Sequence, residues 1–196
     1  ERFARSGFWP IAQSGNNAVL MENTPQGIER YCRMLSQKRQ PGETVGAIVM
    51  NANPFTLGHR HLVEQAAKQC DWLHLFVVRE DASFFPFRAR LEMVRAGVAH
   101  LRNVTVHEGS QYIISRATFP AYFLKESGKV QQAWSEIDVL IFAQYIAPAL
   151  GVTHRFIGSE PFCAVTHQYN QTLHSLLAGQ VEVVEIPRVK MAVSYT

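Results

Sequence analysis

The sequence contains few of the features that mark secreted, metal-binding or membrane-spanning proteins. Only three cysteines occur in its 196 residues, Cys32, Cys70 and Cys163, and none belongs to a CxxC pair. This spacing predicts no disulfide framework and no metal ligands, and it suits a reducing, cytoplasmic environment. The longest apolar stretch, residues 137–152, contains polar residues and a proline and is shorter than the roughly 20 residues of a membrane span. We expect it to form a buried helix.

Charge is also scarce, with 18% of residues charged and a net charge of +3. The 19 basic residues are scattered, which argues against a nucleic-acid-binding groove, whereas a mild positive charge suits a small polyanionic ligand. Because 47% of the residues are hydrophobic, the chain can bury the core of one globular domain. The opening E-R-F-A-R-S-G-F-W-P lacks the apolar core of a signal peptide, and its mixed charge predicts an upstream segment.

Apolar strand-like runs alternate with helix-like segments along most of the chain. The predicted strands are residues 45–50, 72–78, 103–107, 153–158 and 181–186. The predicted helices between them are residues 58–70, 86–100, 119–150 and 163–178. Strands that are apolar on both faces and joined by helical crossovers form parallel sheets covered on both sides. The sequence therefore predicts an α/β fold, a doubly wound five-stranded parallel sheet with helices on both faces.

The region before the first predicted strand has a different character. Residues 1–26 mix glycine, asparagine, serine and proline with no sustained period, which predicts a connecting arm without a core element. A helix is predicted to follow from Ile28 and to stop before Pro41 and Gly42.

The predicted topology indicates where a ligand binds. Open parallel sheets bind ligands beyond the carboxyl ends of their strands, near the point where the strand order reverses. The first strand usually borders that point, and residues 51–62, N-A-N-P-F-T-L-G-H-R-H-L, follow it directly. We therefore expect this segment to form part of the binding site.

Several residues of this segment suit a phosphate group. Asn53 and Pro54 should turn the chain, Thr56 can cap the next helix, and Gly58 leaves room for a ligand beside the backbone. Unpaired N–H groups and the helix dipole favour an anion there. His59, in the first turn, can donate a hydrogen bond to a phosphoryl oxygen in a transition state. The alternative is that His59 merely caps the helix or packs against it.

The neighbouring polar residues need no functional role. Residues two apart on a helix point about 200° from each other, so His61 is expected to face away from a ligand that His59 contacts. Arg60 and Glu64 are four residues apart and are expected to pair on the helix surface.

These residues carry a resemblance to a known family. Thr56, Leu57, Gly58 and His59 resemble the (H/T)xGH signature of the nucleotidylyltransferase superfamily, which has a Rossmann-like fold. More closely, the sequence resembles the [citrate (pro-3S)-lyase] ligases, also called citrate lyase synthetases, from about residue 2 to about residue 190. The blocks that carry this resemblance are residues 46–60, 72–81, 112–120 and 146–163.

The resemblance implies an ATP-dependent acetylation. Family members activate acetate as acetyl-adenylate, release pyrophosphate, and acetylate the thiol of the CoA-derived prosthetic group on the acyl carrier subunit of citrate lyase. ATP with Mg²⁺, acetate and that carrier subunit are therefore the expected cofactors and partners. Acetate is a poor nucleophile and is repelled by a triphosphate, so positive groups must neutralise both and hold them in line.

Two other functions stay open from the sequence. The first is an adenylyltransferase that acts on a phosphorylated cofactor precursor, such as phosphopantetheine or a pyridine mononucleotide. The second is a non-catalytic module that binds ATP or the carrier protein.

The resemblance also implies site residues beyond His59 and Thr56. Arg90 matches an arginine that the superfamily often has on this helix, with a helix-surface arginine as the alternative. A glycine and an acidic residue often contact the nucleotide after the fourth strand, with a turn that caps the next helix as the alternative. The implied ATP-binding residues are Asn53, Pro54, Phe55, Gly58, Arg90, Gly158, Ser159 and Glu160.

Other polar residues are expected at the same edge of the sheet. Arg79 ends the second strand and can reach phosphate or acetate, unless it is simply solvated. Ser115, Arg116 and Thr118 follow the third strand and suit an ordered binding loop, although Arg116 has a structural salt bridge as its alternative. Cys163 has no histidine partner by spacing, and adenylation needs no enzyme thiol, so a covalent role is disfavoured.

The end of the chain departs from the family pattern. The family has an I-S-x-S-x-x-R signature after the fifth strand, whereas this chain runs R-V-K-M-A-V-S-Y-T, in which Ser194 is a candidate remnant. The family also carries an acetyltransferase-like domain before this one. We therefore predict a connecting arm and helix over residues 1–44, and a catalytic domain lacking its C-terminal signature over residues 45–196.

Overall fold

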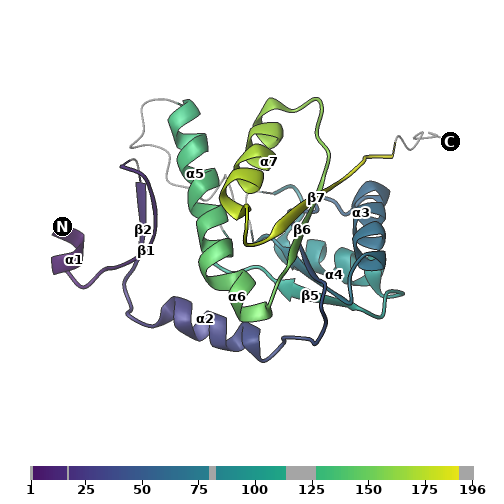
Figure 1. The fold of residues 1–196 in the computed structure, drawn as a ribbon, viewed down its shortest axis with the longest axis horizontal. Helices are drawn as coiled ribbons and strands as arrows, with labels where there is room; N and C mark the ends of the chain where they lie inside the picture. The colour runs from purple at the N-terminus through teal and green to yellow at the C-terminus, as the bar shows by residue number, and fades with distance from the viewer. Residues whose placement is uncertain (1, 17, 80–82, 114–126, 190–196) are drawn as a thin grey trace.

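The fold is built on one parallel sheet. The structure is a computed structural model that describes residues 2–16, 18–79, 83–113 and 127–189. Five strands pair in parallel in the order β5-β4-β3-β6-β7 (Figure 1). They are β3 (Val45–Met50), β4 (Trp72–Val77), β5 (Val104–Glu108), β6 (His154–Gly158) and β7 (Glu182–Ile186). The doubly wound five-stranded sheet predicted from the sequence is confirmed.

Helices cover both faces of this sheet (Figure 1). One face carries α3 (Leu57–Lys68) and α4 (Phe87–Val98). The other carries α2 (Gly27–Ser36), α5 (Ser127–Ile141), a π-helical segment (Phe142–Ile146), α6 (Ala147–Leu150) and α7 (Ala164–Leu177). Two hydrophobic clusters, one on each face, form the core.

The central strand β3 shows how a strand of this sheet is buried on both faces. Successive side chains of a strand point to opposite faces. In β3, Ala47 and Val49 pack into the cluster under α5 and α7, whereas Ile48 and Met50 pack into the cluster under α3 and α4. Side chains on both faces of β3 therefore lie in the core, which is why this strand is apolar throughout.

The apolar stretch of residues 137–152 is helical and buried, as the sequence predicts. It runs from α5 through the π-helical segment into α6, and Ile137, Ile141, Ile146 and Leu150 are each at most 2% exposed. No helix in the described part of the chain is long and apolar enough to cross a membrane.

The N-terminal region contains a core element that the sequence analysis missed. Strands β1 (Trp9–Ser14) and β2 (Ala18–Glu22) form an antiparallel hairpin after the short helix α1 (Arg2–Arg5). Ile11 and Ala12 are buried in the same cluster as α5, and the Tyr145 hydroxyl donates to the Ile11 carbonyl at 3.1 Å. The expectation of a connecting arm without a core element was wrong, because this hairpin buries only a few of its residues and so shows no sustained apolar period. The domain division at residue 44 stays a prediction.

Two buried histidines face each other in neighbouring strands. Nδ1 of His74 in β4 lies 2.8 Å from Nε2 of His107 in β5, and both side chains are at most 2% exposed. Within the described residues, the other nitrogen of each ring is buried without a hydrogen-bond partner. Burial lowers the pKa of His74 to about 4, and burial with the nearby His74 and Lys38 lowers the pKa of His107 to about 3. Both rings are therefore neutral in the folded protein.

This pair predicts that the protein loses stability in mild acid. The unfolded chain protonates each ring near its ordinary pKa of about 6.5, whereas the folded protein does not. Because the folded pKa values are lowered, stability is greatest above pH 6.5 and falls toward pH 4, by about 2 kcal/mol per histidine at pH 5. Urea unfolding at pH 7 and pH 5 measures this loss. The double variant H74L/H107L should lose most of the pH dependence, and the exposed control H167Q should keep it. An unchanged pH dependence in the double variant would contradict this account.

Candidate active site

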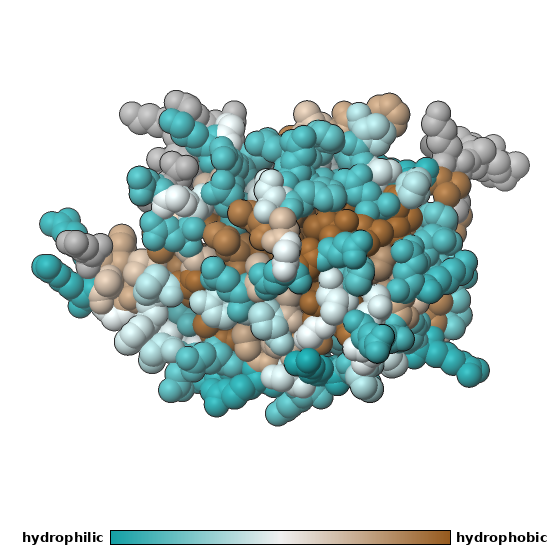
Figure 2. Space-filling view, in the orientation of Figure 1, coloured by the Kyte–Doolittle hydropathy of each residue, from teal (hydrophilic) through white to brown (hydrophobic). Residues whose placement is uncertain are grey.

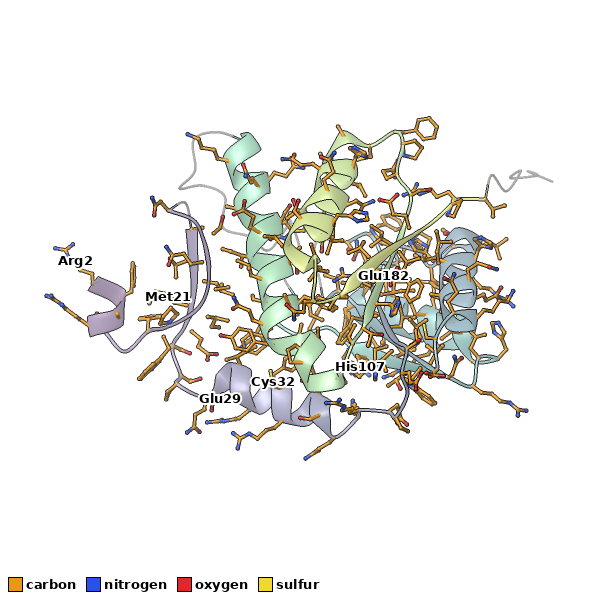
Figure 3. All side chains as sticks on the ribbon, in the orientation of Figure 1. Arg2, Met21, Glu29, Cys32, His107 and Glu182 are labelled. Carbon is orange, nitrogen blue, oxygen red and sulfur yellow. The ribbon has the colours of Figure 1, made fainter. Side chains whose placement is uncertain are left out.

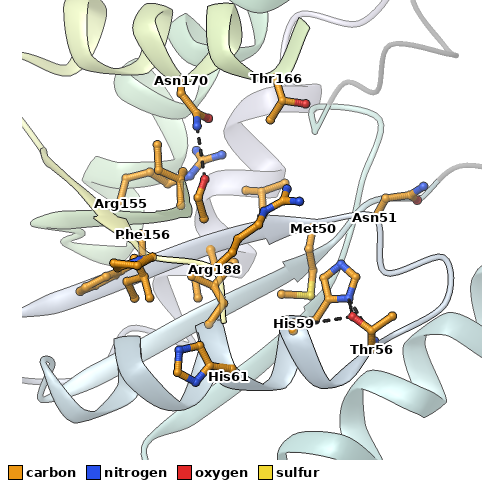
Figure 4. A pocket seen from close by; sticks show the side chains of 18 of the residues that line it. Met50, Asn51, Thr56, His59, His61, Arg155, Phe156, Thr166, Asn170 and Arg188 are labelled. Atoms are coloured by element: carbon orange, nitrogen blue, oxygen red, sulfur yellow. Dashed lines mark hydrogen bonds between the residues drawn. The ribbon is translucent and has the colours of Figure 1, made fainter. Parts of the chain in front are cut away.

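A split in the central sheet creates the site. The strand order reverses between β3 and β6, since β4 and β5 lie on one side and β7 lies on the other. Strands β3 and β6 pair only at Gly46 with His154 and at Ala47 with Arg155, whereas β3 and β4 pair along their full length. Beyond these pairs, a pocket of about 620 Å³ is lined by the carboxyl halves of both strands (Figure 4). This is the position at which open parallel sheets bind ligands.

The pocket is lined by residues from distant parts of the chain. The loop after β3 and the start of α3 contribute one wall, the end of β6 and helix α7 contribute another, and the segment after β7 crosses between them (Figure 4). The polar lining includes Asn51, Thr56, His59, His61, Arg155, Thr166, Tyr169, Asn170 and Arg188.

His59 is held by the cap of helix α3. The Thr56 N–H donates to Nδ1 of His59 at 3.0 Å, and Oγ1 of Thr56 accepts from the His59 N–H at 3.4 Å. This is a capping box in which a histidine takes the position that glutamate usually holds. Because Nδ1 accepts a hydrogen bond from the backbone, the neutral ring carries its proton on Nε2.

The surroundings of His59 favour this neutral form. Burial lowers the pKa of His59, and the positive charge of Arg188 lowers it further. The Phe55 ring stacks on the imidazole, with 5.7 Å between ring centroids. Phe55 in turn lies against Gly97 of α4, where an added Cβ would collide with the phenyl ring. The imidazole is thus fixed by its cap on one side and by a packed aromatic ring on the other.

The first turn of α3 presents free backbone donors. Thr56 accepts the N–H groups of His59 and Arg60, whereas no described group accepts the N–H of Leu57 or Gly58. Gly58 is exposed, and a Cβ added there would meet only Thr56 Oγ1, at 3.6 Å. An anion can therefore approach these donors at the positive end of the helix dipole.

Arg188 brings a cation to the pocket from beyond β7. Its guanidinium pairs with the carboxylate of Glu160, and its backbone N–H donates to Oγ of Ser159 at 3.3 Å. In Figure 4 its side chain extends across the pocket between β6 and α3. The Arg188 side chain is 62% exposed, so it is accessible to a ligand.

Glu160 holds the turn that leads into helix α7. Its Oε1 accepts the N–H groups of Cys163 and Phe162, each at 3.0 Å. These hydrogen bonds, with the charge of Arg188, lower the pKa of Glu160. Gly158 lines the pocket directly. Ser159 and Glu160 do not line it, but both contact Arg188, which does. This geometry matches the strand-to-helix turn of the alternative, although no side chain caps α7 itself.

Arg90 is buried and joins the loops after β3 and β4. Its Nη1 donates to the carbonyl oxygens of Asn51 and Val78, at 2.7 and 2.8 Å, and its Nε donates to the Phe85 carbonyl at 3.0 Å. The side chain is 0% exposed and does not line the pocket. It therefore holds the exits of β3 and β4 together, which is neither the predicted ATP contact nor the surface position given as its alternative.

The remaining predicted site residues lie around the pocket or outside the described chain. Asn53 accepts the Phe85 N–H on its side-chain oxygen at 2.9 Å, and a cis peptide bond joins it to the exposed Pro54. Arg79 is exposed and lies 5.7 Å from the centre of the Phe87 ring. The predictions for Ser115, Arg116, Thr118 and Ser194 fall outside the described residues.

His61 lines the pocket, and the expectation that it faces away from the site was wrong. The two histidines do point to different sides of α3 (Figure 4). The pocket is wide enough to reach both, because it continues past α3 to Pro187 and Val189 after β7. The angle between the two residues correctly predicts that His59 and His61 lie on different sides of α3. The error was the assumption that the pocket borders only one side of this helix.

The sequence analysis also missed the residues that α7 and β6 bring to the pocket. Thr166, Tyr169 and Asn170 line it from one face of α7, at the i, i+3, i+4 spacing that could have signalled them. Arg155, a charged residue in an apolar strand, was another available signal. It is 2% exposed, and its Nη2 donates to the Tyr169 hydroxyl at 3.4 Å.

Buried polar contacts complete this wall. The Tyr169 hydroxyl donates to the carboxylate of Asp138, and burial, followed by the charge of Asp138, raises the tyrosine pKa.

The described residues contain no group of three or more histidine, cysteine, aspartate or glutamate side chains that could hold a metal ion.

Comparison with known proteins identifies the family. A family model described as "Citrate lyase ligase C-terminal domain" matches residues 45–195. The chain is 58% identical over 193 residues to a [citrate [pro-3S]-lyase] ligase of Klebsiella pneumoniae, covering 96% of this chain and 56% of that protein. It is 53% identical over 194 residues to the ligase of the same name from Escherichia coli, covering 96% and 55%. The chain thus spans about half the length of these relatives.

A solved structure supports the same fold. Pantothenate synthetase from Thermus thermophilus matches with a TM-score of 0.56 and 17% identity, over 82% of this chain and 61% of that one. At this identity the match supports the fold alone. The family match over residues 45–195 and the two close relatives carry the assignment: the chain belongs to the citrate lyase ligase family.

Proposed function

We propose that this chain carries out the ATP-dependent activation of acetate and its transfer to citrate lyase. Acetate would be converted to acetyl-adenylate, and the acetyl group would pass to the thiol of the CoA-derived prosthetic group on the acyl carrier subunit. The observation that carries this proposal is the capped, neutral His59 beside free N–H groups in the split between β3 and β6. The family of the chain supplies the reaction class.

The pocket suits ATP in size and in chemistry. Its volume of about 620 Å³ lies in the range of small-molecule sites, roughly 300–1,000 Å³. The N–H groups of Leu57 and Gly58, the Nε2–H of His59 and the guanidinium of Arg188 are donors suited to phosphate oxygens. Magnesium, when bound with ATP, would neutralise part of the triphosphate charge.

In the first step, a carboxylate oxygen of acetate attacks the α-phosphorus of ATP. The new O–P bond gives acetyl-adenylate, and the bond from the α-phosphorus to the bridging oxygen breaks to release pyrophosphate. Negative charge grows on the phosphoryl oxygens during this displacement. His59 would stabilise that charge by donating from Nε2, which needs no proton transfer and no covalent bond to the enzyme.

In the second step, the carrier thiol, as its thiolate, attacks the acetyl carbon. The C–S bond forms, the bond to the adenylate oxygen breaks, and AMP leaves while the thiol proton goes to solvent. The proposed role of the protein here is to keep the acetyl-adenylate in place until the thiol arrives.

Isotope exchange tests the function directly. We expect exchange of labelled pyrophosphate into ATP to require acetate, and mass spectrometry to find one acetyl group on the carrier prosthetic thiol after incubation with ATP, acetate and Mg²⁺. Exchange that requires phosphopantetheine or a pyridine mononucleotide instead would indicate an adenylyltransferase. ATP or carrier binding without any exchange would indicate a non-catalytic module.

The role of His59 predicts both a rate loss and a pH profile. His59→Ala should lower the acetate-dependent exchange rate by about 100- to 1,000-fold, the loss typical for one transition-state donor. Protonation would break the hydrogen bond from the Thr56 N–H to Nδ1. Because the pKa of His59 is lowered, the rate should hold as the pH falls through 6.5 and decline only below it. His167→Ala, a change of an exposed histidine, is the control, and full activity of the His59→Ala protein would contradict the assignment.

The position of Arg188 predicts that its substitution changes both the affinity for ATP and the pKa of His59. Arg188→Met should raise the Kd for ATP by about 10- to 100-fold, the range expected for a lost charge-assisted hydrogen bond. Removing this positive charge should also raise the pKa of His59, which NMR titration of the ring protons measures. Arg188→Lys should restore part of both effects, and Arg30→Met, on the distant helix α2, should change neither. An unchanged His59 pKa in Arg188→Met would rule out the electrostatic contact.

A further inference from the structure

Four large apolar side chains are exposed at the carboxyl edge of the sheet. Leu57, Phe84, Phe162 and Val189 are 61%, 87%, 87% and 49% exposed. Each follows a different strand, β3, β4, β6 and β7, and parallel pairing places the ends of these strands at one edge. Figure 2 shows apolar residues at the top of the molecule above α7 and at the right, where the chain leaves β7. We call these four residues the apolar rim.

The apolar rim lies on the loops that border the pocket. Leu57 lies between Thr56 and Gly58, which line the pocket, and Val189 lines it directly. The Phe162 N–H donates to Glu160, the partner of Arg188. The rim residues therefore sit on the same loops that build the site.

Phe84 joins the rim through the loop after β4. The residues on either side of it are hydrogen-bonded to the loop after β3, since Ser83 bonds Asn51 and the Phe85 N–H donates to Asn53. The Phe84 ring contacts Phe85 edge to face, with 5.1 Å between centroids, and is largely open to solvent.

Binding of ATP and acetate would leave three of the four rim residues uncovered. Leu57, Phe84 and Phe162 are absent from the pocket lining, so a small molecule inside the pocket leaves them in water. Clustered exposed apolar residues, particularly aromatic ones, mark surfaces that another macromolecule covers. A site that serves only small substrates needs no such surface around its mouth.

Positive charge lies beside the rim. Arg79 follows β4, and Arg88 lies in the first turn of α4, where the helix dipole disfavours a cation. Both are exposed, and within the described residues neither forms an ion pair. Arg188 adds a third exposed cation at the pocket. A partner that meets this edge should therefore present acidic side chains.

We propose that the apolar rim is the docking surface for an acidic protein domain that carries the acyl-accepting thiol. This inference rests on the proposed function, because the partner must deliver its thiol into the pocket that holds the acetyl-adenylate. Phe84 and Phe162 pack against apolar groups of the carrier, and Arg79 and Arg88 pair with its carboxylates. The rim thereby aligns the prosthetic arm with the pocket mouth.

The double variant F84S/F162S tests this proposal against the purified citrate lyase acyl carrier subunit. We expect the Kd and KM for the carrier to rise at least about tenfold, because aromatic side chains at the centre of an interface contribute most to binding. Acetate-dependent pyrophosphate exchange without carrier should be unchanged, as should acetyl transfer to a free small thiol. R79E/R88E should raise the same Kd, and added salt should weaken carrier binding to the unchanged protein.

Phe3→Ser provides a matched control. Phe3 is 66% exposed, and the neighbouring Arg2 lies at the left end of the molecule, away from Glu182 of β7 (Figure 3). This variant should bind the carrier as the unchanged protein does. An unchanged carrier Kd in F84S/F162S would overturn the proposal, as would a dimer of the unchanged chain that these substitutions dissociate.

The failure of the proposed function would look different. If the unchanged protein shows no acetate-dependent exchange and no acetylation of the carrier, the reaction itself is wrong. If it shows both, and the rim variants keep their affinity for the carrier, only the docking surface is wrong.

Discussion

The hydrogen bond from the Thr56 N–H to Nδ1 of His59 is the contact on which the proposed chemistry of this site depends. It does two things at once, since it satisfies a donor at the start of α3 and leaves the ring proton on Nε2. Burial and Arg188 then keep the ring neutral by lowering its pKa. A glutamate in the same capping position could also cap the helix but would bring a negative charge toward the triphosphate that we propose binds here. Under the proposed function, the histidine would make this helix cap a donor to phosphate.

Buried interactions away from the pocket hold this donor in place. Arg90 joins the loops after β3 and β4 by donating hydrogen bonds to a carbonyl oxygen of each loop. The Phe55 ring packs between His59 and Gly97. Strands β3 and β6 pair at only two positions, and the space between them beyond these pairs is open to a ligand. Two parts of the fold therefore have separate roles: the packed face of α3 and α4 fixes the proposed donor, His59, and the unpaired ends of β3 and β6 leave room for a ligand.

The parts of this arrangement that are local in sequence could be predicted from it, and the parts that depend on long-range register could not. Thr56, Gly58 and His59 are near neighbours at a strand-to-helix junction, so cap chemistry and spacing were sufficient to group them. Arg188 lies far along the chain and reaches the pocket only through the pairing of β6 with β7. Whether His61 lines the pocket depends on the width of the pocket, and the angle between residues on a helix does not determine that width. The hairpin of residues 9–22 was missed because few of its positions are buried against α5.

The proton on Nε2 of His59 is the central claim of this account. Nitrogen NMR of the ¹⁵N-labelled chain at pH 7, before and after addition of a non-hydrolysable ATP analogue, measures it most directly. The account predicts an unprotonated Nδ1 and a protonated Nε2 in the free protein, with the Nε2 resonance shifting when the analogue binds. A proton on Nδ1, a doubly protonated ring at this pH, or an Nε2 resonance that does not respond to the analogue would contradict it.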